Sequence, residues 1–312
     1  MDLSIVIVNW NTRALLRDCL ASVSEGLGPL QVEVLVVDNA SEDGSADLVR
    51  RDFPEVTLIE NAENLGFAAG NNVALRSATG RYVMLLNTDT LVHGSVLPEA
   101  VAWLDAHPQV GVMGPRVLND DGTVQPSCSA FPSLRFLAMQ TLGLTRIARW
   151  DSYRMTGWDR TSEREVEVIS GAAMFVRRSA MEQVGLLDEA FFFYGEETDW
   201  CLRFARAGWQ LVFAPIPEIT HFGNGSAGKL NHRRDVLMTE GTTRLHRKHG
   251  GVLAGIACFG ILAAHNASRA VFWSAMSLLR KPGAALRARH FRLVVADLPK
   301  AWPSAGTRTA RS

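Results

Sequence analysis

The sequence is poor in cysteine and has no cysteine motif. Its four cysteines are scattered over 312 residues without a CxxC pair: Cys19, Cys128, Cys201 and Cys258. This spacing argues against a disulfide framework or a zinc site and predicts a reducing compartment. The opening MDLSIVIVNW has an acid, no basic segment and only a short apolar run. We therefore expect neither a signal peptide nor a membrane anchor there, and a catalytic part in the cytoplasm.

The sequence also lacks net charge, with 32 Lys and Arg against 32 Asp and Glu. Bulk nucleic-acid binding requires a strongly basic surface, so we expect no nucleic-acid partner. The balance hides an asymmetry, because residues 281–312 contain seven basic residues and one acid, a charge of about +6.

Two nucleotide-binding motifs are missing. No GxGxxG follows the first predicted strand, which disfavours a dinucleotide site, and no GxxxxGK[ST] is present, which excludes P-loop chemistry.

Short apolar runs alternate with segments of helical periodicity from residue 4 to residue 108. This alternation predicts an α/β fold with a doubly wound, mainly parallel sheet. Strands are expected at 4–10, 32–41, 56–60 and 81–90, and helices at 11–23, 43–53, 66–80 and 94–108. The pattern changes near 115 and again near 226–240, which divides the chain into segments 1–115, 116–226 and 227–312. The second is expected to hold an Asp-Gly hairpin near 117–133, a strand at 166–178 and a last strand at 210–215.

Polar residues follow three of the expected parallel strands: Asn9 and Asn11, Asp38 and Asn39, and Asn87 and Asp89. Such strand ends meet at one edge of a sheet, where ligands bind. Taken singly, each residue fits an ordinary turn equally well; together they favour a ligand site. A nucleotide is the expected ligand, with Asp38 bonding its base or ribose and the backbone amides of residues 64–67 facing its diphosphate.

Asp89 has a use at such a site, because a carboxylate can hold a divalent cation against a leaving diphosphate. His221, just after the last expected strand, is a candidate second ligand. As a lone histidine it is also explained as an ordinary loop residue. An imidazole ligand favours Mn²⁺ slightly over Mg²⁺.

The stretch 191–209 (FFFYGEETDWCLRFARAGW) sets three acids among aromatic and apolar residues. On a helix starting near Gly195, Asp199 and Arg203 pair at i,i+4, with Glu196 near that face. Glu197 is turned by about 100° from Glu196 and points elsewhere. Favourable interaction with the helix dipole is the simpler explanation of all three acids. The neighbouring aromatics either raise a carboxylate pKa and stack on sugars, or are core.

Several motifs occur in order over roughly residues 3–226: SIVIVNWN, VVDNASEDGS, NLGFAAGNN, LLNTD, SGAAMFVRR, VGLLDEAFFFYGEETDWCLRFARAGW and HFGNGS. Together they resemble an inverting family 2 glycosyltransferase of the GT-A fold, in the branch of bacterial rhamnosyltransferases that build envelope polysaccharides.

The resemblance implies roles for individual residues. Asp38 and Asn64 would contact the nucleoside, in a donor-binding set that comprises Asn9, Asn11, Asp38, Asn39, Asn64, Gly66, Asn71, Asn87 and Asp89. Asn87 stands where the family has the first acid of its DxD motif, so Asp89 would carry the metal with less charge than two acids supply. Glu197 falls where the family's base stands, usually an Asp. The acceptor side would comprise Gly171, Ala172, Glu196, Asp199 and Trp200.

Residues 251–282 hold two apolar stretches interrupted at His265, Asn266 and Arg269, with basic residues on both sides. The interruption spoils a single membrane span. The pattern suits helices lying on an anionic membrane surface, at the cytoplasmic face of the inner membrane. A helical hairpin packed on the catalytic domain or in a homodimer fits nearly as well. The tail WPSAGTRTARS is expected to be disordered.

These observations predict a metal-dependent inverting glycosyltransferase that moves rhamnose from dTDP-rhamnose to a lipid-linked or polysaccharide acceptor. A donor of UDP- or GDP-activated galactose, glucose or mannose is the alternative within the class. A nucleotidyltransferase is a rival, although NWNTR lacks the glycines of a triphosphate-binding loop. A non-catalytic sugar-nucleotide-binding protein is a further one, against which the retained Glu197 argues.

Overall fold

The fold is described from a computed structural model. It describes the chain except residues 147–152, 154, 156, 217, 224–229 and 304–312. The end of the HFGNGS motif and most of the tail predicted to be disordered lie outside the described residues.

Within the described residues, eight strands form the main sheet in the order β10-β13-β6-β12-β4-β1-β2-β3. The pairs β4–β1, β1–β2, β2–β3 and β13–β6 are parallel, and β12 and β10 run antiparallel to their neighbours. The bounds are β1 Leu3–Asn9, β2 Val32–Asp38, β3 Thr57–Glu60, β4 Tyr82–Leu86, β6 Val110–Gly114, β10 Arg164–Glu165, β12 Ala173–Arg177 and β13 Gln210–Phe213. The predicted mainly parallel α/β sheet is confirmed.

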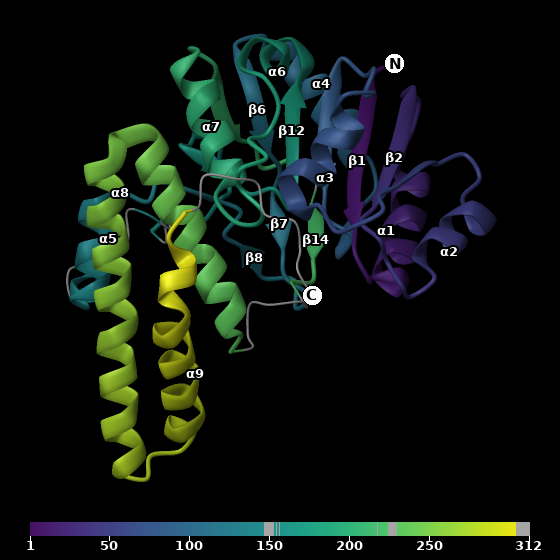
Figure 1. The fold of residues 1–312 in the computed structure, drawn as a ribbon. Coiled ribbons are helices and arrows are strands. Elements are labelled where there is room, and N and C mark those ends of the chain that lie inside the picture. Colours follow the sequence, from purple (N-terminus) through teal and green to yellow (C-terminus); the bar gives the residue numbers. More distant parts are fainter. Residues whose placement is uncertain (147–152, 154, 156, 217, 224–229, 304–312) are drawn as a thin grey trace.

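Helices cover both faces of this sheet (Figure 1). Alternate residues of β1 point to opposite faces, so Leu3, Ile5 and Ile7 pack under one helical layer and Val6 under the other. The first layer is α1 Arg13–Gly26, α2 Ser45–Asp52 and α4 Val96–Ala106. The second is α3 Gly66–Leu75, α6 Arg178–Val184 and α7 Glu196–Arg206. The sheet is thereby buried on both faces, as its continuous apolar strands require.

A smaller sheet extends one edge of the fold in the order β5-β14-β7-β8. The strands are β5 Thr90–Val92, β14 Ile219–His221, β7 Val117–Leu118 and β8 Val124–Gln125. The pair β7–β8 is the predicted Asp-Gly hairpin. A further antiparallel pair joins β9 Cys128–Ser129 to β11 Val168–Ile169.

Two local predictions are wrong. The strand expected at 166–178 is broken at Ser170–Ala172 into β11, which pairs with β9, and β12, which pairs with β4 and β6. Gly80 does not end α3, which stops at Leu75; a methyl group at Gly80 would lie 2.5 Å from the Ser4 amide nitrogen, so close packing against β1 explains this glycine. Thr12, the residue before α1, makes no side-chain cap to that helix; its hydroxyl group bonds to Asn9 at the end of β1.

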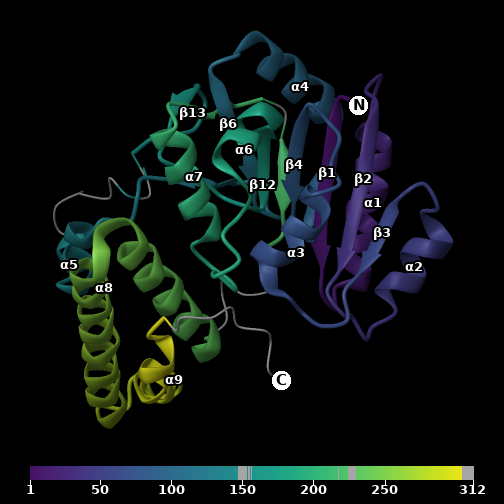
Figure 2. The ribbon, with the colours of Figure 1, turned by 45° about the horizontal axis from the view of Figure 1, so that its top comes forward.

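The C-terminal segment forms α8 His232–Leu278 and α9 Ala284–Asp297. An earlier helix, α5 Leu134–Thr141, lies beside α8. Short 3-10 turns occur at Leu144–Arg146 and Leu298–Ala301. Gly251 (φ 82°) interrupts α8, which folds back there. We call residues 232–250 the proximal leg and residues 252–278 the distal leg. The distal leg and α9 form a hairpin that extends away from the sheet (Figures 1 and 2). Among the described helices, α8 alone is long and apolar enough to cross a membrane, judged by length and composition.

Candidate active site

The ends of β1 and β2 meet through buried side chains, because parallel pairing sets Asn9 opposite Asp38. Asn9 Nδ2 donates to Asp38 Oδ1 (2.7 Å) and to Ser41 Oγ (3.0 Å). Thr12 Oγ1 donates to Asn9 Oδ1 (2.7 Å) and also lies 2.9 Å from Thr88 Oγ1, which ties this edge to the end of β4. The predicted convergence of the three strand ends is therefore observed.

Most of the amides predicted to line the donor pocket hold this edge in shape. Asn9 is fully buried, and Asn39 and Asn71 bond to backbone carbonyls of the α3 turn, Gly66 and Phe67 respectively. Asn11 (φ 54°) accepts from the Glu42 amide. We therefore correct the role expected of Asn9, Asn39 and Asn71 from direct contact with a donor to support of the strand ends.

The prediction that the amides of Gly66 and Phe67 face a diphosphate is wrong. The Gly66 amide donates to Asn64 Oδ1 (2.9 Å), and the Phe67 amide donates to the Phe192 carbonyl (3.0 Å). A methyl group at Gly66 (φ 81°) would lie 2.4 Å from that same Phe192 carbonyl oxygen. The turn entering α3 thus packs against the segment that leads into α7.

Asp89 and His221 lie together where β5 pairs with β14. This antiparallel pairing sets His221 opposite Thr90, and His221 Nε2 is 3.2 Å from Asp89 Oδ1. Gln125 Oε1 lies 2.6 Å from His221 Nδ1 and accepts its proton, because the Gln125 amide nitrogen is directed to Asn119 Oδ1. With Nδ1 donating to Gln125, Nε2 is the ring atom that faces the Asp89 carboxylate. The predicted closeness of Asp89 and His221 is confirmed.

This donor set fits a divalent cation. Two ligands at right angles, each about 2.1 Å from one ion, are about 3 Å apart, close to the distance between Nε2 and Oδ1. A carboxylate and an oriented neutral imidazole are suitable ligands for Mn²⁺. Asn87 is half-buried beside this pair, and its amide donates to the Ala172 carbonyl (3.0 Å).

The three acids of α7 separate as the helical geometry predicts. Asp199 is fully buried and accepts from Arg203 Nε (2.9 Å), which confirms the i,i+4 pair. Glu196 is 4% exposed, and its Oε2 has no hydrogen-bond partner among the residues that the structure describes. Burial raises the pKa of Glu196 well above its usual range, and the neighbouring charge of Glu197 adds to the effect. Glu197, whose pKa is also raised by burial, faces a cavity.

Three residues predicted on the acceptor side are corrected. Trp200 is fully buried, 5.2 Å from the ring of Phe204, and its Nε1 donates to the Gly185 carbonyl (2.8 Å). Asp199 and Glu196 are also buried beneath α7. None of the three presents its side chain to the cavity, because the apolar stripe of α7 turns that face toward the sheet.

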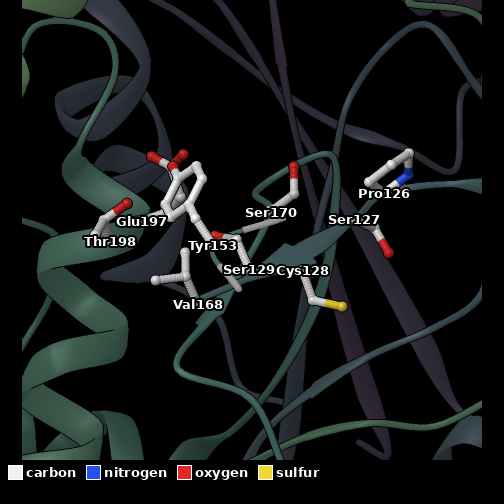
Figure 3. Close-up of a pocket in the computed structure, with 9 residues that line it drawn as sticks. All are labelled: Pro126, Ser127, Cys128, Ser129, Tyr153, Val168, Ser170, Glu197 and Thr198. Carbon is white, nitrogen blue, oxygen red and sulfur yellow. The ribbon is translucent and has the colours of Figure 1, made fainter. Parts of the chain in front are cut away.

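The cavity beside Glu197 has a volume of about 390 Å³ (Figure 3). Glu197 and Thr198 enter it from α7, and Tyr153 also lines it. Its lining is rich in hydroxyl groups and consists of Pro126, Ser127, Cys128, Ser129, Tyr153, Val168, Ser170, Glu197 and Thr198. Gly171 borders it, since a methyl group there would lie 3.9 Å from Glu197 Cβ. Ala172 is buried behind it. A carboxylate facing several hydroxyl groups suits a hydroxylated substrate.

Sequence reasoning missed the residues that shape these sites from a distance along the chain. Gln125 orients His221 across 96 residues, and Ser41 holds Asn9 and the Asn11 amide. Trp10, between two site asparagines, is 55% exposed. The sequence itself shows a tryptophan at a strand end between two asparagines, whereas its exposure is known only from the structure.

The chain thus has two candidate sites, one of acids and amides at the strand ends and one a carboxylate at a hydroxyl-lined cavity. The chain belongs to the family described as "Glycosyl transferase family 2", whose model matches residues 4–185, and it is a glycosyltransferase.

Two relatives with named activities are similar to this chain in sequence. The chain is 31% identical over 241 residues to N-acetylglucosaminyl-diphospho-decaprenol L-rhamnosyltransferase of Mycobacterium tuberculosis, which covers 73% of this chain and 78% of that protein. It is 25% identical over 224 residues to the low-salt glycan biosynthesis hexosyltransferase Agl10 of Haloferax volcanii, covering 70% of this chain and 67% of that one.

Solved structures share the fold. Mannosyltransferase PcManGT from Pyrobaculum calidifontis, in complex with GDP-Man and Mn²⁺, superposes with a TM-score of 0.57 at 19% identity over 96% of this chain and 86% of that one. TarS 1-349 from S. aureus superposes with a TM-score of 0.52 at 14% identity over 100% and 99% of the two chains. The GT-A fold expected from the motifs is confirmed.

Proposed function

We propose that the protein transfers a sugar, with inversion, from a nucleotide sugar to a hydroxyl of a lipid-linked or polysaccharide acceptor in cell-envelope glycan synthesis. The observation that carries the proposal is Glu197, a half-buried carboxylate at a cavity lined by hydroxyl groups, beside the strand ends that gather Asp38 and Asp89. The expected donor is dTDP-rhamnose, and rhamnose is the sugar transferred. The mycobacterial relative, named as an N-acetylglucosaminyl-diphospho-decaprenol L-rhamnosyltransferase, supports this choice.

In this proposal the acceptor sugar enters the cavity and places one hydroxyl against Glu197. Glu197 takes the hydroxyl proton as the oxygen forms its bond to the anomeric carbon. The bond from that carbon to the diphosphate oxygen breaks on the opposite side, and the nucleoside diphosphate leaves with the electron pair. One displacement inverts the anomeric configuration.

Asp89 and His221 would hold a divalent cation, Mn²⁺ or Mg²⁺, which supplies positive charge next to the leaving diphosphate. The Pyrobaculum mannosyltransferase was solved in complex with Mn²⁺, which supports this choice. Gln125 contributes by holding His221 in the tautomer that leaves Nε2 free to bind metal. Asp38 is expected to bond the base or ribose.

The test is transfer from a panel of dTDP-, UDP- and GDP-sugars with Mn²⁺ or Mg²⁺. We expect dTDP-rhamnose to be used, and both Glu197→Gln and His221→Ala to lose turnover, with the His221→Ala variant needing more metal. Near-normal transfer by Glu197→Gln together with loss in Asp199→Asn would refute the base assignment. Turnover of a UDP- or GDP-hexose alone would replace the donor, and binding of nucleoside triphosphates in place of every nucleotide sugar would favour a nucleotidyltransferase.

We also propose that the C-terminal hairpin binds the cytoplasmic face of the inner membrane, where a lipid-linked acceptor resides. Apolar side chains are exposed along it, with Val271, Leu278 and Leu286 at least 63% exposed. Exposed basic residues lie beside them at Lys281, Arg287, Arg289 and Arg292. This combination suits insertion into an anionic surface, with burial of the apolar side chains and attraction of the basic ones.

A further inference from the structure

The proximal leg of α8 touches the catalytic helix at its first turn. Gly241 lies on Tyr194, since a methyl group at Gly241 would lie 2.0 Å from the Tyr194 carbonyl oxygen. Gly195 packs in return, with its added methyl group 3.3 Å from the Gly241 carbonyl oxygen. The two backbones are therefore in direct contact immediately before Glu196 and Glu197.

The backbone at this contact is held in a costly conformation. Tyr194 (φ 71°) and Gly195 (φ 100°) are consecutive residues with positive φ. For tyrosine the left-handed region costs about 1–2 kcal/mol, and such a conformation persists only where the surroundings impose it. The proximal leg is one of the elements that do so.

A second contact lies at the end of the proximal leg, on the carboxylate of Asp199. Its Oδ1 accepts from Lys248 Nζ (2.7 Å) and His249 Nε2 (2.7 Å), while Oδ2 accepts from Arg203 on its own helix. Lys248 Nζ also reaches Asp188 Oδ2 (2.7 Å), in the segment before α7. Two of these three partners of a fully buried carboxylate thus come from α8.

A third contact between α7 and α8 fixes the tautomer of His249. Arg206 Nη1 donates to His249 Nδ1 (2.7 Å), so the proton of a neutral ring resides on Nε2 and points to Asp199. Burial lowers the pKa of His249, which favours this neutral form. The donors therefore match the acceptor atoms on both helices.

Asp199 is two residues from Glu197 on the same helix. The position of the α7 backbone therefore sets where the Glu197 side chain meets the cavity. No side-chain hydrogen bond to Glu197 is found within the described residues, so its placement depends on the helix. Gly251, where α8 folds back into the distal leg, follows His249 by two residues.

We propose that Lys248 and His249 are positioning residues for the transfer reaction: through Asp199 they hold α7 so that Glu197 faces the acceptor cavity. The proposal rests on the proposed function, in which Glu197 is the base. It makes the C-terminal segment part of the catalytic architecture, in addition to its proposed membrane contact.

The test compares Lys248→Met, which keeps the length of the side chain, with Lys248→Arg, which restores a donor. The control is Lys300→Met, which breaks an exposed ion pair with Asp297 (2.6 Å) far from α7 in sequence. We expect at least a tenfold loss of kcat in Lys248→Met, a donor KM within twofold of wild type, and recovery in Lys248→Arg. Hydrogen exchange should accelerate at the amides of α7 and stay unchanged in β1 and β4.

A kcat of Lys248→Met within twofold of wild type, with unchanged exchange in α7, would overturn the proposal. So would a loss shared equally by kcat and donor binding with faster exchange throughout, since that is a general loss of structure. If Lys248→Met does not fold, His249→Phe removes the second donor at similar ring volume, and the same outcomes apply. Glu197→Gln is assayed in parallel: its retention of activity would refute the base assignment whatever Lys248 does.

Discussion

At the scale of single residues, the site separates two adjacent glutamates by their surroundings. Glu197 faces a cavity of hydroxyl groups, whereas Glu196, one position earlier, is buried with an oxygen that has no hydrogen-bond partner. Burial raises the pKa of both carboxyl groups. Their side chains point in different directions because consecutive helical residues are turned about 100° apart. Glu197 is therefore placed for the proposed proton exchange with a substrate, and Glu196 is not.

The raised pKa of Glu197 predicts the acid side of the activity profile. A base works only when deprotonated, so kcat/KM should fall as pH drops through a pKa above the ordinary glutamate value of 4.5. Initial rates between pH 4.5 and 9 measure this. Glu197→Gln should lower kcat by roughly 10²–10⁴ and abolish that limb, and Glu197→Asp, one methylene shorter, should retain it at reduced kcat. A limb that persists in Glu197→Gln would assign it to another group.

Glu196 predicts a pH dependence of stability. Its folded-state pKa is raised, so the folded protein binds this proton more tightly than the unfolded chain does. Its contribution is therefore full at low pH and is lost as pH rises through the folded-state pKa. Glu196→Gln should lose less stability than wild type between pH 5 and pH 8, measured by urea unfolding. Glu165→Gln, at an exposed position on β10, is the control, and equal slopes in all three proteins would contradict the prediction.

At the scale of elements, contacts between loops join the donor and acceptor sides. The turn entering α3 bonds to Phe192, and α8 contacts Tyr194 and Gly195 in the same connection to α7. The segment 191–195 is thus held from both sides by elements distant in sequence. Its aromatic rings were expected either to serve a sugar site or to be core, and Phe191, at 2% exposure, is core, whereas Phe193 is 40% exposed.

Gly66→Ala should disrupt this junction, because its φ of 81° disfavours alanine and the added methyl group would lie 2.4 Å from the Phe192 carbonyl oxygen. Gly122→Ala is a matched control, with φ 78° and no atom within 4 Å. The shared φ penalty is about 1–2 kcal/mol, and crowding should add about 1–3 kcal/mol at Gly66 alone. Urea unfolding of both variants measures the difference. Equal losses would show that Phe192 can move aside at little cost.

At the scale of the whole molecule, a catalytic α/β body carries a helical hairpin that extends from it (Figure 2). The body is held by two apolar layers on either side of the sheet, while the hairpin leaves Leu253, Val271 and Leu278 more than 70% exposed. Large apolar side chains exposed along one hairpin favour a partner surface. The basic residues beside it favour an anionic one.

Co-sedimentation with vesicles tests this prediction. The protein should bind vesicles containing phosphatidylglycerol more strongly than vesicles of phosphatidylcholine, and added salt should weaken binding. Val271→Asp should reduce binding severalfold, whereas Met238→Asp, 45% exposed on the proximal leg, should not. Absence of vesicle binding, together with a dimer in light scattering that Val271→Asp dissociates, would assign this surface to a second copy of the chain.

The sequence by itself determined the succession of strands and helices, the strand ends that gather Asn9, Asp38 and Asp89, and the separation of Glu197 from Asp199. These follow from periodicity and helical geometry, which act over a few residues. Only the tertiary structure decided which amides stay open to a ligand, that Gln125 orients His221, and that α8 supplies Lys248 to Asp199. The contact of Gln125 with His221 spans 96 residues and that of the adjacent His249 with Asp199 spans 50, and close packing selects such contacts among many partners of equal local plausibility.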